Sequence, residues 1–126
     1  MNACNSVEWM RRAIADRFPE ESKAVDAEML DYPKDAHESW LERFCDTTNQ
    51  AMALRDECKV QAHLAFMSQQ LADGDDEVRR VIDVGYAENM MSLLDAETKR
   101  WAWPLVPRNL KQLYLDLWGE PKELRS

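Results

Sequence analysis

The sequence predicts an all-α fold, a compact single-domain bundle of five to seven helices. The chain of 126 residues contains only three glycines and five prolines, which disfavours a turn-rich all-β fold. Apolar residues recur at helical spacing through most of the chain, and no run alternates apolar and polar residues as a half-buried strand does. A chain of this length forms one core, so a single helical domain is expected over residues 1–126.

Two helices are expected before Pro33. The first runs from the N-cap Ser6 to about Phe18, where Pro19 ends it. A short second helix is expected from Ser22, and it ends before Pro33 because the residue preceding a proline avoids helical backbone angles. The buried faces of these helices are expected to contain Val7, Met10, Ile14, Phe18, Val25 and Met29.

Two further helices are expected between Asp35 and Ala72. Asp35 caps the first of them. Residues 47–49 are weak helix formers, so a break or bend is expected there, and the next helix runs from about Gln50 to Ala72. The alternative is one continuous helix from Asp35 to Ala72. The apolar stripe of the first of the two helices contains His37, Trp40, Leu41, Phe44, Cys45 and Thr48.

A central helix is expected from Glu77 to Leu94. Gly74 provides a left-handed cap for the preceding helix, and an aspartate at position 75 or 76 caps the new one. Gly85 costs the central helix about 1 kcal/mol relative to alanine, which indicates that another backbone crosses closely there. Apolar residues lie on two sides, as in a helix packed on both flanks, and one of these faces contains Val78, Ile82, Tyr86 and Leu93.

The C-terminal part is expected to form a short helix and a longer one. Asp95 caps the short helix, which extends through Trp103 and is interrupted by Pro104. Pro107 suits the first position of the last helix, and Gly119 ends it. Residues at the spacing of one apolar helical face are Leu110, Leu113, Tyr114, Leu117 and Trp118.

The charge of the chain bears on its partners and its location. Sixteen Lys and Arg residues oppose 24 Asp and Glu residues, which gives a net charge of −8. This charge repels phosphate backbones and anionic lipids, so neither nucleic acid nor a membrane is an expected partner. No stretch reaches the roughly 18 apolar residues of a membrane helix. Three irregularly spaced cysteines indicate reduced thiols in the cytoplasm, with Cys45 and Cys58 in the core and Cys4 near the N-terminus.

No motif indicates catalysis, a metal site or a cofactor. His37 and Cys45 lie about 12 Å apart along a helix, which is too far to share an ion, and both histidines are expected at the surface or at helix caps. The acidic segment 73–77 has its glycine second, whereas a calcium-binding loop has it sixth. We therefore expect no enzyme. The alternative is a small hydrolase or ligand-binding bundle that uses Glu88 and Asn89.

The acidic residues are concentrated in one part of the chain. Residues 1–77 contain 17 acidic and 8 basic residues, whereas residues 78–126 contain 7 and 8. Acidic surfaces attract basic partners, and aromatic residues among them contribute buried contact area. The alternative interpretation is a solvated face that keeps the protein soluble. The expected partner-binding residues are Tyr32, Asp35, Glu38, Glu42 and Asp46.

The central segment also resembles a known class of protein. Residues 77–90, with the sequence EVRRVIDVGYAENM, are similar to a helix of small acidic all-helical bacterial immunity proteins from polymorphic or contact-dependent toxin systems. The resemblance covers mainly residues 66–103. It implies a cytoplasmic protein that binds one cognate toxin domain and blocks it, and it carries over no contact residues.

Two functional hypotheses follow. The first is a binding protein that neutralises a cognate intracellular toxin by occluding its active site, with a basic toxin domain as the partner. The alternative is a helical adaptor or regulatory subunit without catalytic activity, which forms a homodimer through Trp101 and Trp103.

Overall fold

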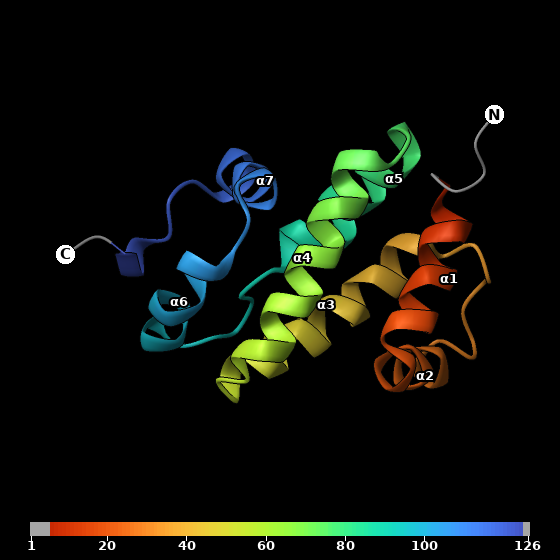
Figure 1. Cartoon of the computed structure of the whole chain (residues 1–126), viewed down its shortest axis with the longest axis horizontal. Helices are drawn as coiled ribbons and strands as arrows, with labels where there is room; N and C mark the ends of the chain where they lie inside the picture. The colour runs from red at the N-terminus through yellow and green to blue at the C-terminus, as the bar shows by residue number, and fades with distance from the viewer. Residues whose placement is uncertain (1–5, 125–126) are drawn as a thin grey trace.

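The computed structural model describes residues 6–124, and this part of the chain contains seven α-helices and no strand, which confirms the expected all-α bundle. The α-helices are α1 (Val7–Arg17), α2 (Pro19–Glu28), α3 (His37–Ala53), α4 (Glu57–Asp73), α5 (Asp76–Val81), α6 (Ala96–Ala102) and α7 (Arg108–Trp118). Helices α1 and α2 lie at one end of the molecule, α6 and α7 at the other, and α3 and α4 cross the middle (Figure 1).

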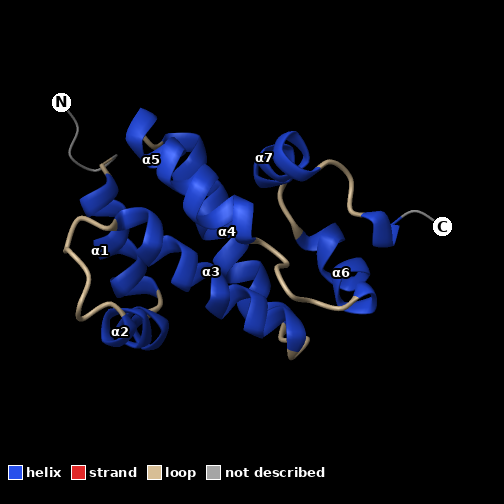
Figure 2. Cartoon of the chain, turned by 180° about the vertical axis from the view of Figure 1, so that it is seen from behind, coloured by secondary structure: helices blue, strands red, loops and turns tan. Residues whose placement is uncertain are grey.

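Shorter helical segments lie between these helices and after α7. A π-helical segment and three 3-10 helices are present: η2 (Ile82–Tyr86), η3 (Ala87–Asn89), η4 (Trp103–Leu105) and η5 (Lys122–Leu124). Seen from behind, the described chain consists of helices joined by loops, and the loop between α2 and α3 runs outside the bundle beside α1 (Figure 2). No described helix is long and apolar enough to cross a membrane.

The first two helices follow each other without a gap. Ser6 caps α1 as expected, because its hydroxyl oxygen accepts a hydrogen bond from the backbone N–H of Trp9 at 3.2 Å. The expected start of α2 at Ser22 is wrong, since α2 begins at Pro19. Proline suits this position because the first N–H groups of a helix have no partner within it. Ser22 instead lies buried within α2.

The connection between α3 and α4 differs from both expectations. Helix α3 continues through residues 47–49 and ends at Ala53, so neither the break at 47–49 nor one helix to Ala72 is correct. Thr48 and Asn49 are buried and hydrogen-bonded to residues of other segments. These tertiary contacts outweigh the weak helix propensity of the two residues.

The caps around α3 and α4 come from residues other than the expected ones. Asp35 does not cap α3, whose N-cap position is Ala36 and has no side-chain hydrogen bond. The chain turns after α3 at Arg55, which has a positive φ of 57°. Asp56 then caps α4, because its carboxylate accepts a hydrogen bond from the N–H of Lys59 at 3.2 Å.

Gly74 separates α4 from α5 without a left-handed conformation. Its φ is −75°, so the expectation of a left-handed cap is wrong. A side chain at this position would overlap the side chain of Val78 and the backbone of Gln70, so close packing explains the glycine. Asp75 caps α5 as expected, since its carboxylate accepts a hydrogen bond from the N–H of Val78 at 2.8 Å.

The central helix is shorter than expected. Its helical backbone ends at Asn89 rather than Leu94, after changing from α to π and then to 3-10 geometry. Asn49 fixes this end: its amide donates to the Asn89 carbonyl at 2.9 Å, and its side-chain oxygen accepts from the N–H of Met91 at 2.8 Å. Leu93 therefore lies beyond the helix and is fully exposed, although the spacing placed it on a buried face.

The C-terminal helices begin and end close to the expected residues. Asp95 caps α6 through a hydrogen bond from the N–H of Thr98 at 2.8 Å. Pro107 is the N-cap residue of α7 rather than its first helical residue, and Gly119 ends α7 with a φ of 75°. Only a residue without Cβ adopts this φ readily.

Further expectations about burial are wrong. Leu117 and Trp118, which the spacing placed on the apolar face of α7, are 49% and 60% exposed. Cys58 is exposed, because α4 begins only at Glu57 and its first turn faces solvent. His63 is completely buried, although both histidines were expected at the surface or at caps. Cys45 is buried as expected, and burial raises the pKa of its thiol. Cys4 lies outside the described residues.

Candidate partner-binding site

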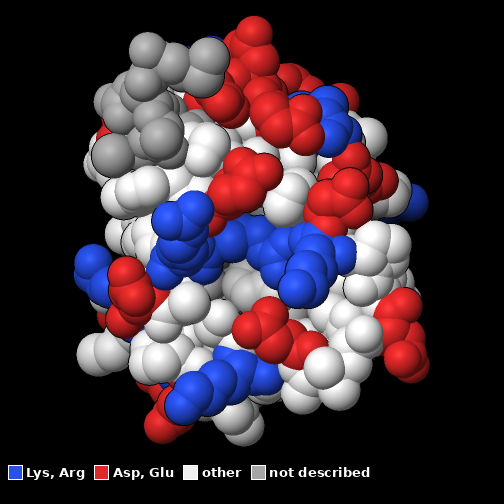
Figure 3. Space-filling model, turned by 90° about the vertical axis from the view of Figure 1, so that its right-hand side faces the viewer, with Lys and Arg blue, Asp and Glu red and all other residues white. Residues whose placement is uncertain are grey.

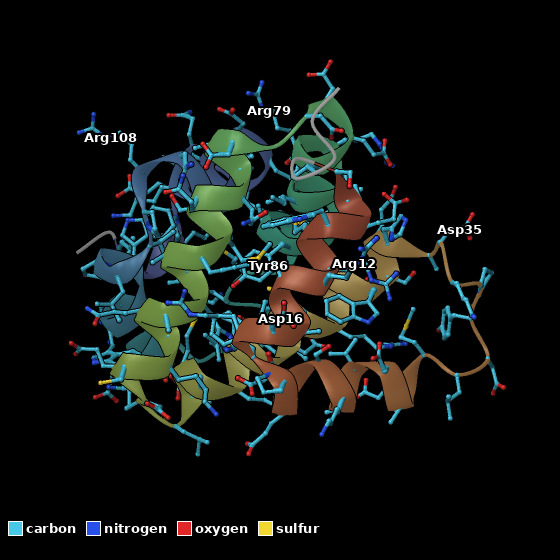
Figure 4. The ribbon with its side chains drawn as sticks, turned by 45° about the vertical axis from the view of Figure 1, so that its right-hand side comes forward. Arg12, Asp16, Asp35, Arg79, Tyr86 and Arg108 are labelled. Carbon is cyan, nitrogen blue, oxygen red and sulfur yellow. The ribbon has the colours of Figure 1, made fainter. Side chains whose placement is uncertain are left out.

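The five residues expected to bind a partner lie on α3 and on the loop before it. Tyr32 and Asp35 belong to the loop, whereas Glu38, Glu42 and Asp46 belong to α3, and all five are exposed. The spacing of four residues places the three acidic residues of α3 along one face of the helix. Asp35 projects from the loop away from the helices (Figure 4).

Arg43 holds Tyr32 in place. One guanidinium nitrogen, Nη2, donates a hydrogen bond to the Tyr32 hydroxyl at 3.1 Å, and the guanidinium carbon lies 5.6 Å from the centre of the tyrosine ring. The Arg43 Nε atom is 3.6 Å from a carboxylate oxygen of Glu28. Tyr32 remains 43% exposed, so the aromatic ring is fixed but accessible.

Carboxylates outnumber basic groups around Arg43. The pKa of Asp46 is raised, first by burial and then by the nearby charge of Glu42, and Arg43 opposes this effect only in part. Glu28 also raises the Asp46 pKa. Besides its hydrogen bond with Tyr32, the charges of Glu28 and Glu42 help to raise the pKa of Arg43, so three carboxylates share one arginine. We refer to Glu28, Tyr32, Glu42, Arg43 and Asp46 as the acidic patch.

Glu38 and Asp35 do not share this environment. The Glu38 carboxylate pairs with Arg80 of α5, which also binds Glu77 at 2.7 Å. The charge of Glu38 is therefore compensated within the chain. The structure thus brings Tyr32, Glu42 and Asp46 together around Arg43 and leaves Glu38 and Asp35 outside the patch.

A pocket of about 480 Å³ adjoins Tyr32 and was not expected from the sequence. Arg11 of α1 reaches into this region, where its Nη1 atom donates to the Lys34 carbonyl at 2.8 Å and lies 3.1 Å from Nδ1 of His37. Its guanidinium also lies 4.8 Å from the centre of the Trp40 ring. The pocket is lined by Glu8, Arg11, Asp26, Met29, Leu30, Tyr32, Pro33, Lys34, His37 and Trp40.

Further contacts around the pocket join α3 to α1 and α2. The indole N–H of Trp40 donates to Asp26 at 2.8 Å, and His37 Nε2 lies 3.8 Å from a carboxylate oxygen of Glu8. Burial lowers the pKa of Arg11, an effect that Asp26 and Glu8 oppose. Most of the lining comes from residues 26–40, but Glu8 and Arg11 come from α1, so no local motif predicted the pocket. The signal available in the sequence was a histidine on the apolar stripe of α3.

The patch and the pocket belong to one recognised domain. Residues 11–119 match the sequence model of a family described as a domain of unknown function, DUF7674. The chain belongs to the DUF7674 family. Comparisons with curated proteins and with solved structures found no match. The DUF7674 match begins at Arg11 and ends at Gly119, so it includes the whole acidic patch and most of the pocket lining.

Charges of both signs occur on the adjoining side of the DUF7674 domain. On the side where α1, α2 and the loop before α3 lie, basic side chains cross the middle, with acidic side chains above and below them (Figure 3). On this face the described acidic side chains therefore do not form a continuous surface (Figure 3). A partner would meet acidic and basic groups in alternation, which favours a defined orientation.

A buried chain of hydrogen bonds has the order of groups found in hydrolytic triads. Nε2 of His63 is 2.9 Å from a Glu21 carboxylate oxygen, and its Nδ1 atom is 2.9 Å from the Thr48 hydroxyl. The Thr48 hydroxyl continues to the Tyr86 hydroxyl at 2.8 Å. Thr48, His63 and Tyr86 are completely buried, so a substrate has no access to the threonine hydroxyl. The chain of hydrogen bonds joins α2, α3, α4 and η2 inside the DUF7674 domain.

The two residues proposed for a small hydrolase make structural contacts. The side-chain amide of Asn89 donates to the backbone carbonyl of Gly85 at 3.0 Å. The backbone carbonyl of Glu88 accepts a hydrogen bond from the Trp118 indole N–H at 3.0 Å. Among the described residues, no three or more His, Cys, Asp or Glu side chains converge in a way that could hold a metal ion.

Proposed function

We propose that the protein is a binding protein that recognises a basic protein partner through the acidic patch. The observation that carries this proposal is the grouping of Glu28, Glu42 and Asp46 around a single base, Arg43, beside a tyrosine that Arg43 holds in an exposed position. Like charges held close together lower the stability of the folded protein, so such a grouping is expected where function requires it. A cationic group of a partner would relieve this repulsion and gain electrostatic energy on binding.

The pocket beside Tyr32 supports a protein partner in particular. Protein interfaces draw most of their binding energy from a few side chains, often aromatic, that fit into pockets. Leu30 is 82% exposed and Tyr32 is 43% exposed, and both line the pocket. An apolar side chain of the partner would fit between them, next to the charges of the acidic patch.

The more specific form of the proposal is neutralisation of an intracellular toxin. It rests on the resemblance of residues 77–90 to bacterial immunity proteins. In this form the acidic patch covers a basic active site, such as the substrate groove of a nuclease, and excludes the substrate. Electrostatic attraction would speed association, and the buried aromatic contacts would lengthen the lifetime of the complex.

The alternative of a homodimeric adaptor has less support. The Arg55 guanidinium lies 5.3 Å from the Trp101 ring centre, and the Lys111 ammonium lies 4.9 Å from that of Trp103. Trp103 also packs edge-on against Tyr114 at 5.5 Å. Both indoles therefore use their ring faces for contacts within the chain.

The experiment is a binding assay with the product of the adjacent gene as the candidate toxin. The test variant carries Glu42→Lys and Asp46→Lys. The control variant carries Asp16→Lys and Glu97→Lys, which makes the same change in net charge at two exposed residues on α1 and α6. Association rates are measured by surface plasmon resonance at several salt concentrations, and protection is scored by growth of cells that express the toxin.

We expect the Glu42→Lys and Asp46→Lys variant to associate at least about tenfold more slowly than the control, with a weaker salt dependence and lost protection. Circular dichroism checks that both variants fold. Equal rates for the two variants would show that the acidic patch is not the binding surface. Absence of any complex, together with absence of protection by the wild-type protein, would remove the toxin-neutralising role.

A further inference from the structure

A second concave surface lies between the C-terminal turns of α4 and the start of α7. It is an open groove of about 810 Å³, which falls within the range of small-molecule sites. Leu71 of α4 and Leu113 of α7 line it and pack against the hydrophobic core. The apolar floor is therefore part of the folded structure and does not depend on a mobile loop.

Hydrogen bonds fix the two walls of the groove to each other. The Ser68 hydroxyl donates to the side-chain oxygen of Asn109 at 2.7 Å, and the Asn109 amide donates to the Ser68 carbonyl at 3.0 Å. Asn109 also accepts a hydrogen bond from the backbone N–H of Leu110 at 2.9 Å. A fixed floor reduces the ordering cost that a ligand must overcome on binding.

Two arginines line the groove, Arg79 of α5 and Arg108 of α7. Both project outward at the same end of the molecule, with α4 between them (Figure 4). Neither guanidinium makes a hydrogen bond or ion pair with a described residue, whereas the adjacent Arg80 side chain binds both Glu38 and Glu77. No Asp or Glu occurs among the described residues that line the groove, although the whole chain has a net charge of −8.

We propose that this groove binds a small molecule that carries an anionic group on an apolar body. Arginine binds carboxylate and phosphate groups through paired N–H donors, and the leucines supply apolar contact for the rest of the ligand. The groove thus has the opposite charge preference to the acidic patch, and the two sites are independent. A protein partner on the acidic patch leaves this inference unaffected.

The test is an NMR titration of the isotopically labelled full chain with decanoate. Decyltrimethylammonium and decanol serve as matched probes, because they share the alkyl chain but carry a positive charge or no charge. A short peptide of alternating Leu and Glu tests an acidic protein segment as the ligand. The test variant carries Arg79→Gln and Arg108→Gln, and the control variant carries Arg12→Gln and Arg17→Gln on α1.

We expect decanoate to shift the amide resonances of Ser68, Leu71, Asn109 and Leu113 in a saturable way. The affinity should fall at least about tenfold in the Arg79→Gln and Arg108→Gln variant and stay unchanged in the control. Equal binding of all three alkyl probes, or shifts confined to other residues, would overturn the proposal. It would also be overturned by the peptide binding in place of decanoate, or by shifts that depend on protein concentration alone, which would assign the groove to another protein or to a second copy.

Discussion

His63 connects the surface of the molecule to its core. One ring nitrogen meets the Glu21 carboxylate, which is partly exposed, and the other meets the buried Thr48 hydroxyl. Burial lowers the pKa of His63, and the hydrogen bond with Glu21 offsets this effect only in part. The folded protein therefore favours the neutral ring, which can bond to both partners.

We predict that stability falls as the pH decreases below about 6.5, the ordinary pKa of histidine. The His63 pKa is lower in the folded state than in the unfolded state, so the unfolded state binds more protons between the two values. The stability that His63 contributes is present above the unfolded pKa and is lost as the pH falls through the folded pKa. The slope is at most about 1.4 kcal/mol per pH unit. Glu21, whose pKa is also lowered, acts in the same direction at more acidic pH.

The measurement is urea unfolding of the wild type and of His63→Gln at neutral and mildly acidic pH. Glutamine keeps hydrogen-bonding groups near Glu21 and Thr48 but does not titrate. We expect the unfolding free energy of the wild type to decrease more with acidification than that of the variant. Parallel profiles for the two proteins would show that another group causes the pH dependence.

At the level of secondary structure, η2 crosses α3 at the centre of the fold, and the two backbones approach closely at Gly85. A Cβ atom added to Gly85 would lie 2.8 Å from the Glu38 carbonyl oxygen and 3.1 Å from Cβ of Leu41. The close crossing expected at this glycine is thus confirmed. The π-helical geometry of η2 was not expected, because a single extra residue per turn leaves no trace in the apolar spacing.

We predict that Gly85→Ala destabilises the protein by about 1–3 kcal/mol, because the Glu38 contact is with backbone and cannot turn away. Helix propensity alone predicts the opposite effect, because alanine in place of glycine stabilises a helix by about 1 kcal/mol. Thermal unfolding followed by circular dichroism shows whether the variant is less or more stable than the wild type. A variant as stable as the wild type, or more stable, would show that the backbone at Gly85 is not closely packed.

The ends of the helices illustrate which local signals are reliable. Ser6, Asp75 and Asp95 cap helices as expected, because an N-cap bond joins a side chain to a backbone N–H only three residues away. The break after α3 was misplaced because buried hydrogen bonds of Thr48 and Asn49 reach residues about forty positions away.

At the scale of the whole molecule, the two candidate sites differ in charge. The acidic patch combines three carboxylates with one arginine, whereas the groove between α4 and α7 contains two arginines and no described carboxylate. Three of the residues predicted to bind a partner lie together around Arg43, namely Tyr32, Glu42 and Asp46. Glu38 does not, because its partner Arg80 lies on another helix.

We predict that the full chain is a monomer at micromolar concentration. Trp101 and Trp103, the proposed dimer contacts, are partly buried and stack with Arg55 and Lys111 of the same chain. Light scattering coupled to size-exclusion chromatography measures the mass directly. A dimer that dissociates when Trp101 is replaced by alanine would contradict this expectation and favour the adaptor hypothesis.

The helical class, the approximate extent of most helices and the acidic stretch before and along α3 could all be predicted from the order of the residues alone. These features depend on propensity, apolar spacing and caps, which act over a few residues. The packing of the helices was needed to show which charges are compensated, which histidine is buried and where the pocket beside Tyr32 and the groove between α4 and α7 lie. Those properties arise from contacts between residues distant in the chain, such as Arg80 with Glu38 and Arg11 with His37.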